Sequence, residues 1–354
     1  MKSPVSLLPT LLLATLLPAA EWYKGNTHVH TVLCGHADST PEAVAGWYLD
    51  HGYNFLVLSE HNKFIDPATV DLGTDARKDF LLIPGEEVTG HKVIHTTAMN
   101  IDRLVPWDFK HDERSAIIQN HVHEARKAGG TTILNHPNFR WAVKPEDILP
   151  VEHLYMFELY NGHPHVHNFG DAHRMSTEQQ WDKLLTAGMT IYAVASDDAH
   201  TFKKLDEKQS NPGRGWVMVR SNKLEPHAIT HAMMDGDFYA SSGIVLKTLE
   251  RSRKEITIDV DTCSTDKELA SSLLYGTRVR KGSPGYKIEM IGEEGKVLET
   301  VEGTSAKFQI PECAPYVRCK VSLAKEDTDG VLRGYYAWIQ PVFLDKRGDG
   351  ILYE

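Results

Sequence analysis

The sequence predicts an α/β barrel followed by a small all-β domain, and three observations support this fold class. Short apolar runs alternate with helical patterns over residues 21–245, and polar residues follow the ends of those runs. From residue 246 to 354, short alternating runs separated by turn residues replace that pattern. Alternating strands and helices form parallel sheets, and polar residues at the strand ends of a barrel meet at one mouth.

Length and charge limit the kind of protein. A chain of 354 residues is longer than a typical single domain, so a large domain and a small one are expected. Lys and Arg number 38 against 48 Asp and Glu, a net charge of −10, and no basic run occurs. Such a chain has no general attraction to nucleic acid, so we expect no nucleic-acid partner. The 19 histidines are notable because histidine is the commonest metal ligand.

Residues 1–20 are expected to be a secretory signal peptide. Lys2 precedes an apolar run that ends at Pro18-Ala19-Ala20, and the run is short for a membrane span. The protein is therefore expected to be exported, either to a periplasm or outside the cell. An uncleaved signal segment is the alternative, and it is the only membrane contact we expect. Export would permit a disulfide, most plausibly among Cys263, Cys313 and Cys319.

The first elements form a βαβ unit. Residues 22–26 are extended, and a helix is expected after Ser39, whose hydroxyl can cap it with Glu42 three residues on and Pro41 in the first turn. Gly52 ends that helix. Residues 55–59 form an unbroken apolar run, as in a strand buried on both faces, and end at Glu60-His61.

The unit then repeats along the chain. We expect further strands at 80–83, 93–101, 131–134, 154–159, 189–195 and 216–219, and helices at 113–128, 177–187 and 226–234. Ser176 is the expected cap of the helix at 177–187. Beyond them, alternating runs at 256–260, 286–290 and 317–321 predict a small β-sandwich.

Histidines and acids recur at the predicted strand ends. His28 and His30 are two residues apart after a strand, so both imidazoles point the same way and could bind Zn²⁺, Mn²⁺ or Fe²⁺. Nine residues share such positions, and together they predict a metal site: His28, His30, His36, His61, Glu87, His95, His136, Asp198 and His200. Cys34 could be a neighbour of that site, although a small packed thiol is the simpler interpretation.

Five ordered stretches resemble the PHP family, the polymerase and histidinol phosphatase domain. They are His28-Val29-His30-Thr31, residues 52–62, Pro84-Gly85-Glu86-Glu87, Asn135-His136-Pro137 and Ser196-Asp197-Asp198-Ala199-His200. The resemblance covers residues 22–245 and implies a distorted (β/α)7 TIM-like barrel with two or three divalent ions. Where this family usually has Asp before the second-motif histidine, this chain has Glu60.

The resemblance also implies three groups of ligands. His28, His30, Glu87 and Asp198 would hold one ion, and Glu87 would bridge to a second ion with His95 and His136. His36, His61 and His200 would hold a third. His91 is an alternative to His95, and Asp197 is an alternative to Asp198.

Such a site implies hydrolysis by a hydroxide that bridges two ions, since metals lower the pKa of bound water. Asp198 and His200 are the expected catalytic residues, with Asp38 an alternative to His200 as proton donor. Arg140, or else Arg174, is expected to bind the substrate phosphate. The Gly162–His167 stretch is interpreted as a mouth loop that could contact substrate.

The sequence therefore predicts an exported metal-dependent hydrolase whose partner is a small-molecule phosphoester, most plausibly a phosphomonoester. Two alternatives stay open. Residues 84–89 and 158–162, with the C-terminal β-domain, resemble the branch that includes carbaryl hydrolase, which cleaves esters or carbamates with a similar site. A non-catalytic metal-binding module of the PHP type is the other.

Overall fold

The computed structural model describes residues 20–73, 75, 78–107, 110–271, 274–279 and 282–348. The apolar segment 1–19, which carries the expected signal peptide, lies outside the described residues. No helix within the described ranges is long and apolar enough to cross a membrane. All four cysteines are described and free, so the disulfide that export would permit is not present: Cys319 is buried, whereas Cys263 and Cys313 are exposed.

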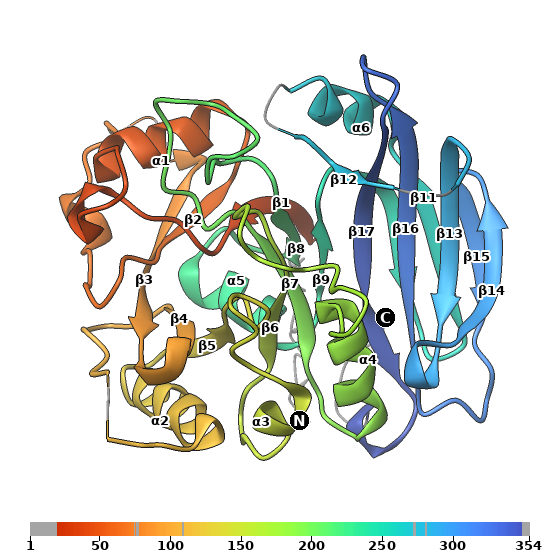
Figure 1. Cartoon of the computed structure of the whole chain (residues 1–354), viewed down its shortest axis with the longest axis horizontal. Coiled ribbons are helices and arrows are strands. Elements are labelled where there is room, and N and C mark those ends of the chain that lie inside the picture. Colours follow the sequence, from red (N-terminus) through yellow and green to blue (C-terminus); the bar gives the residue numbers. More distant parts are fainter. Residues whose placement is uncertain are drawn as a thin grey trace, which may run out of the picture.

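A mixed β-sheet forms the centre of the N-terminal part (Figure 1). Parallel pairs join β1 to β2, β2 to β3, β5 to β6 and β6 to β7, whereas β3 and β4 form an antiparallel pair. The strands of this part are β1 (Glu21–Asn26), β2 (Phe55–Leu58), β3 (Leu81–Thr89), β4 (His95–Met99), β5 (Thr131–Leu134), β6 (Met156–Asn161), β7 (Tyr192–Ser196), β8 (Trp216–Ser221) and β9 (Phe238–Ser241).

Helices surround this sheet and bury their apolar sides against it, as Ile117 and Val122 of α2 do. Thr40, rather than the expected Ser39, caps α1 by accepting from the Ala43 N–H. Ser176 caps α4 as expected, in a capping box with Gln179. The helices are α1 (Pro41–Asp50), α2 (Arg114–Lys127), α3 (Pro145–Ile148), α4 (Thr177–Thr186) and α5 (Pro226–Met234).

The strands do not close into the expected (β/α)7 barrel. Each strand has two edges, and β1 uses one for β2 and the other for the antiparallel β8, so β7 cannot pair with β1. The described strands therefore form an open path that ends at β7. The Gln340 side chain of β17 instead bonds the Ala193 backbone of β7, with N···O distances of 2.9 and 2.7 Å.

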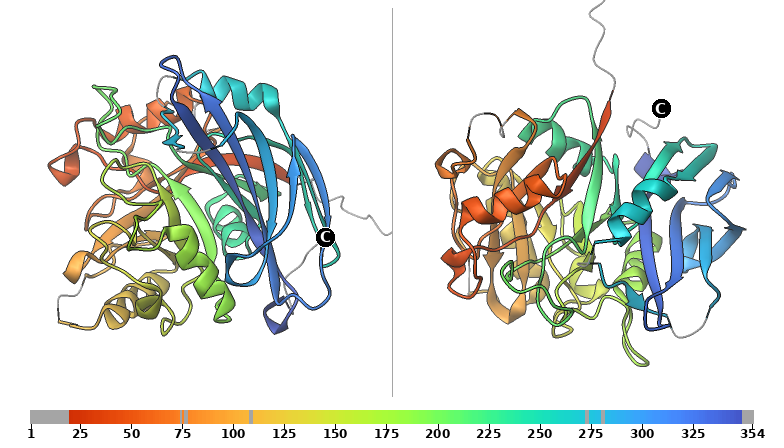
Figure 2. Two further views of the ribbon diagram at one scale, coloured as in Figure 1. Left: turned by 45° about the vertical axis from the view of Figure 1, so that its right-hand side comes forward. Right: turned by 90° about the horizontal axis from the view of Figure 1, so that it is seen from above.

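The C-terminal part is a two-layer β-structure with one helix that the sequence pattern did not predict (Figure 2). One layer, β14-β13-β16-β17, continues the large sheet because β17 pairs with β9, and the other is β10-β11-β15. Ile258 and Phe308 of one layer and Ile288 and Val321 of the other share a core. The elements are β10 (Leu246–Arg251), β11 (Glu255–Val260), α6 (Thr262–Leu269), β12 (Thr277–Arg278), β13 (Gly285–Ile291), β14 (Val297–Glu302), β15 (Ser305–Gln309), β16 (Tyr316–Glu326) and β17 (Leu332–Phe343).

Candidate metal centre

The candidate ligands gather at one edge of the N-terminal sheet. His28 and His30 follow β1, His61 lies just after β2, and His136 is the second residue after β5. Glu87 lies within β3 and forms an isolated parallel bridge with His61. Because these strands run parallel, their carboxyl ends place the five side chains on the same side of the molecule.

Three more candidate ligands lie at this edge and come from β4 or from the segment after β7: His95, Asp198 and His200. His95 opens β4, and β4 is antiparallel to β3, so its first residue pairs with Thr89 near the end of β3. Asp198 and His200 follow β7, where the Asp198 N–H donates to the His28 carbonyl at 3.0 Å. Asp198 and His136 both have positive φ, at 51° and 25°, a backbone region that non-glycine residues seldom adopt.

The Glu87 carboxylate is the centre of the cluster. Its side chain is 1% exposed, so its charge is shielded from solvent. Five imidazole nitrogens lie close to it: His61 Nδ1 at 2.6 Å, His28 Nε2, His95 Nδ1 and His136 Nε2 at 3.2 Å each, and His30 Nε2 at 3.5 Å. A carboxylate with two oxygens among five imidazoles has the position that a bridging ligand requires.

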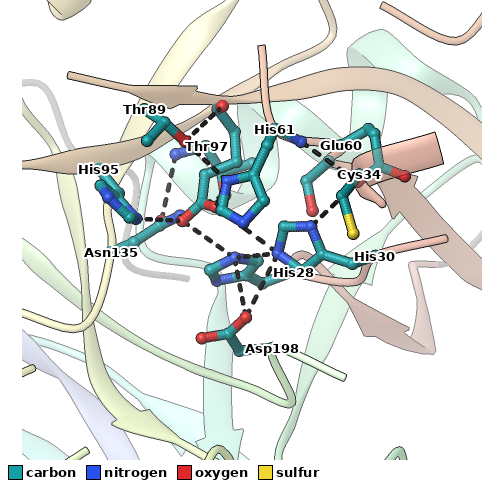
Figure 3. Close-up of polar contacts among 12 residues, drawn as sticks. His28, His30, Cys34, Glu60, His61, Thr89, His95, Thr97, Asn135 and Asp198 are labelled. Atoms are coloured by element: carbon teal, nitrogen blue, oxygen red, sulfur yellow. Dashed lines mark hydrogen bonds and ion pairs between the residues drawn. The ribbon is translucent and has the colours of Figure 1, made fainter. Parts of the chain in front are cut away.

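Asp198 completes a second set with the first two histidines. Figure 3 shows His28, His30 and Asp198 pointing toward one another, with Asp198 Oδ1 3.4 Å from His28 Nε2 and 3.3 Å from His30 Nε2. The two Nε2 atoms are 3.1 Å apart. Ligand atoms around a tetrahedral ion, at bonds of roughly 2.1 Å, are about 3.4 Å apart. The spacing therefore suits a shared cation.

Ligand-type atoms gather within 4.8 Å of one another in overlapping groups. His36, His61 and His200 form one group, as expected for a third ion. His28, His30 and Glu87 form another group, which contains three of the four residues expected for the first ion. Two groups differ from expectation, because His61 joins Glu87 and His95, and His136 joins His28 and Asp198. All groups among the described residues are His28-His30-Glu87, His28-His136-Asp198, His61-Glu87-His95, His36-His61-His200 and His30-Cys34-His200.

Two further buried carboxylates orient the imidazoles. Glu158 lies 2.8 Å from His28 Nδ1 and accepts from the His136 backbone N–H at 2.7 Å. Glu60 lies 3.2 Å from His30 Nδ1 and accepts from Thr31. With Nδ1–H held in this way, each Nε2 presents its lone pair to the cluster. The sequence did not identify Glu158 as part of the site, although it lies within β6 as Glu87 lies within β3.

The buried carboxylates of the cluster favour positive charge on the imidazoles around them. Burial alone would lower the pKa of His30, but contacts with Asp198, Glu60 and Glu87 raise that pKa to about 9. Burial opposes ionisation of Glu60 as well, yet hydrogen bonds from His30 and Thr31 hold its pKa at about 2. Protons and a divalent cation compete for such a site, because metal ligands must be deprotonated imidazoles and carboxylates.

Buried polar atoms without hydrogen-bond partners indicate whether an ion would fit in the cluster. His200 Nε2 has no hydrogen-bond partner among the described residues. Glu87 Oε2 has none either, because the close approach of His61 lacks hydrogen-bond geometry. Such buried polar atoms are costly unless something else pairs with them. Imidazoles and carboxylates suit Zn²⁺, Mn²⁺ or Fe²⁺, so the residues fit the expected ions.

In each of the two pairs of alternative ligands, the structure favours one member. Asp197 is buried but faces away from the imidazoles, accepting from Tyr48 Oη at 2.7 Å and from the backbone N–H groups of residues 213–215. Asp198 faces them. His91 belongs to no ligand group among the described residues, whereas His95 does.

A cavity of about 410 Å³ opens over the cluster. Lys208 is the only Lys or Arg among the described residues that line it. Arg140, expected to bind phosphate, is exposed, lies outside this lining and stacks on Phe139 with its guanidinium carbon 5.4 Å from the ring centroid. Arg174 lies over Trp141 at 4.0 Å.

Asp38, an alternative proton donor, also lies outside this lining. It accepts from the backbone N–H groups of Phe202 and Lys203 at 3.0 and 3.1 Å. His163, in the expected mouth loop, does line the cavity, and its ring centroid is 6.1 Å from that of His200.

Fold and site together define an α/β protein with a histidine- and carboxylate-rich centre at the ends of its strands. No family model and no curated protein matches the sequence. Similar solved structures include a two-domain protein of Bacteroides vulgatus ATCC 8482 containing a predicted PHP-like metal-dependent phosphoesterase. The TM-score is 0.48 and the identity 14%, over 91% of this chain and 95% of that chain.

A second similar structure is a protein of Bifidobacterium adolescentis ATCC 15703, assigned by inference as a metal-dependent phosphoesterase. Here the TM-score is 0.36 and the identity 15%, over 53% of this chain and 89% of that chain. At these values neither likeness supports an argument about activity.

Proposed function

We propose that this protein is a metal-dependent phosphoesterase of the PHP type that hydrolyses small phosphomonoesters. The observation that carries the proposal is the buried Glu87 carboxylate surrounded by imidazoles beneath a cavity of about 410 Å³. Such a cavity is of the size that small-molecule ligands occupy.

Two or three ions of Zn²⁺, Mn²⁺ or Fe²⁺, held by the nine candidate ligands, would supply an acidified water and positive charge for phosphoryl oxygens. Glu87 holds the centre of this arrangement, and Glu158 and Glu60 fix the imidazoles of His28 and His30. Asp198 and His200 are the proposed catalytic residues, because both line the cavity beside Glu87.

His163 is a candidate donor to the leaving oxygen. Its Nδ1 accepts from the His165 backbone N–H at 3.2 Å, so in the neutral ring the proton is on Nε2. A neutral Nε2–H in the cavity can donate to an oxygen that gains negative charge. Lys208 would attract the phosphoryl group from the rim.

A carboxylic ester or carbamate is the second candidate substrate. The carbaryl-hydrolase-like stretches noted above suggest it, and Phe139 and Pro164 give the cavity apolar walls beside Lys208. A substrate without a phosphate would need less positive charge. A non-catalytic metal-binding module would hold ions without turnover.

Metal analysis and a substrate panel distinguish these functions. We expect purified protein to contain two or three equivalents of Zn, Mn or Fe and to release phosphate from phosphomonoesters. Chelation should abolish this activity and added metal should restore it. Turnover of 4-nitrophenyl acetate without phosphate release from 4-nitrophenyl phosphate would favour the ester hydrolase, and bound metal without any turnover would favour the binding module.

We also propose export through cleavage near residue 20. Mass analysis of the amino terminus of protein purified from cell fractions tests it. Full-length protein in the cytoplasm would contradict it.

A further inference from the structure

A second cavity, of about 320 Å³, adjoins the metal cavity. His163 and Pro164 line both, so one extended molecule could occupy the two together. The second cavity lies between the segment 160–169, which contains the mouth loop, and residues 274–277 of the C-terminal part, with Glu207 and Arg214 also in its lining. The C-terminal part thus contributes directly to the surroundings of the metal centre.

Aromatic rings form part of its wall. Tyr160, Phe169 and Tyr275 line the cavity, and Phe169 is 44% exposed, so its ring is accessible to a ligand. The ring centroids of Tyr160 and Phe169 are 6.4 Å apart. Trp338 stacks on Tyr160 from behind at 5.7 Å, which holds this wall in place.

The charged residues that line the second cavity are one arginine and one glutamate, Arg214 and Glu207. Arg214 is 6% exposed, and its Nη2 donates to the Asp206 carbonyl at 2.8 Å and to Asn211 Oδ1 at 3.0 Å. Its guanidinium carbon lies 5.1 Å from the Tyr275 ring centroid. Glu207 pairs with Arg333 at 3.2 Å. Because one cation and one carboxylate line the cavity, its wall carries no net formal charge.

We propose that this second cavity is a subsite for a neutral, hydroxyl-rich ring, so that the substrate is a sugar phosphate. The phosphate part rests on the proposed function, whereas the sugar subsite stands on this cavity alone. The C–H faces of a pyranose pack against electron-rich aromatic rings, and its hydroxyls bond to polar groups such as Glu207 and Thr277. With its phosphate in the metal cavity, the sugar would extend past His163 and Pro164.

Saturation-transfer NMR tests the subsite without requiring catalysis. Methyl glycosides of glucose, galactose and mannose carry no phosphate, and we expect ring-proton signals from at least one of them with the wild-type protein. Phe169→Ala should remove most of that signal. The substitution is at an exposed side chain, so the fold should be retained. Trp107→Ala, at a similarly exposed aromatic residue outside both cavities, is the matched control and should keep the signal.

Kinetics add a second measurement if phosphate is released. The ratio of kcat/KM for glucose 1-phosphate to that for ethyl phosphate should fall about tenfold in Phe169→Ala and stay unchanged in Trp107→Ala. Absence of saturation transfer to all three glycosides, or its full retention in Phe169→Ala, would overturn the subsite. A protein that binds glycosides but hydrolyses no phosphoester would disprove the proposed function and leave the subsite supported.

Discussion

At the scale of single residues, the main feature of the site is that two carboxylates contact many imidazoles. Glu87 and Asp198 together lie within 3.6 Å of six histidines: His28, His30, His61, His95, His136 and His200. Removing one imidazole should therefore affect the ion it would hold more than the fold.

His61→Ala should lower metal content and activity together. His61 is the imidazole nearest to Glu87 and also belongs to the group with His36 and His200, so its loss weakens two sets of ligands. We expect the loss of about one ion per chain and a fall in activity of about 10–100-fold. Elemental analysis beside a phosphatase assay measures both, with the exposed His153→Ala as control. Unchanged metal content would remove His61 from the ligands.

Lys208, rather than Arg140, should contribute to phosphate binding. Lys208 lines the metal cavity, whereas Arg140 stacks outside it. Loss of a charge-assisted contact should raise the KM for a phosphomonoester about tenfold in Lys208→Ala, and Arg140→Ala should change it little. Steady-state kinetics of the two variants decide this. A larger rise in KM for Arg140→Ala than for Lys208→Ala would instead support Arg140 as the phosphate-binding residue.

At the scale of elements, the direction of β4 and the free edge of β7 explain most departures from a regular barrel. The antiparallel β4 brings His95 to the metal edge at its first residue. The Ala193 backbone of β7 is bonded by a side chain instead of a neighbouring strand. Gln340 supplies both a donor and an acceptor there, and it is fully buried.

Gln340→Ala should destabilise the protein more than an ordinary surface substitution. The change would leave the Ala193 N–H and carbonyl unpaired in the interior, at a cost of about 2–3 kcal/mol in the free energy of unfolding. Urea titration measures this free energy, with the exposed Gln309→Ala as the matched control. Equal midpoints for both variants would show that Gln340 does not support the β7 edge.

At the scale of the whole molecule, a buried ion-pair network joins α4 to the C-terminal layer. Arg318 of β16 is 1% exposed and bonds Asp182 through Nε at 2.7 Å and Nη2 at 2.8 Å. Glu178 pairs with Arg318 Nη1 at 3.0 Å and with Lys320 Nζ at 2.6 Å. Breaking such a network by removing one partner leaves an uncompensated buried charge.

Glu178→Gln should lower stability at neutral pH and flatten its acid dependence. Burial opposes ionisation of Glu178, but Lys320 and Arg318 outweigh it and lower the pKa from 4.5 to about 2. A lowered pKa stabilises the fold above the unfolded value near 4.5, and this contribution is lost as the pH falls toward 2. We expect a loss on the order of 2 kcal/mol at pH 7. Parallel unfolding curves for variant and wild type from pH 7 to pH 2 would contradict this.

The sequence by itself determined the local elements and the kinds of ligand. Apolar runs predicted most strands within a few residues, and the two-residue spacing of His28 and His30 placed both on one side of a strand end. Those features are local, since backbone geometry and side-chain period depend on neighbouring residues alone.

Only the tertiary structure decided which of several similar residues reach the centre. It selected His95 over His91, because β4 turns back along β3, and Asp198 over Asp197, because backbone N–H groups and Tyr48 occupy the latter. The tertiary structure also placed Glu158 next to His28 Nδ1. It paired β8 with β1, and this pairing leaves the sheet open. These outcomes depend on contacts between residues far apart in the chain, and the spacing of neighbouring residues does not encode them.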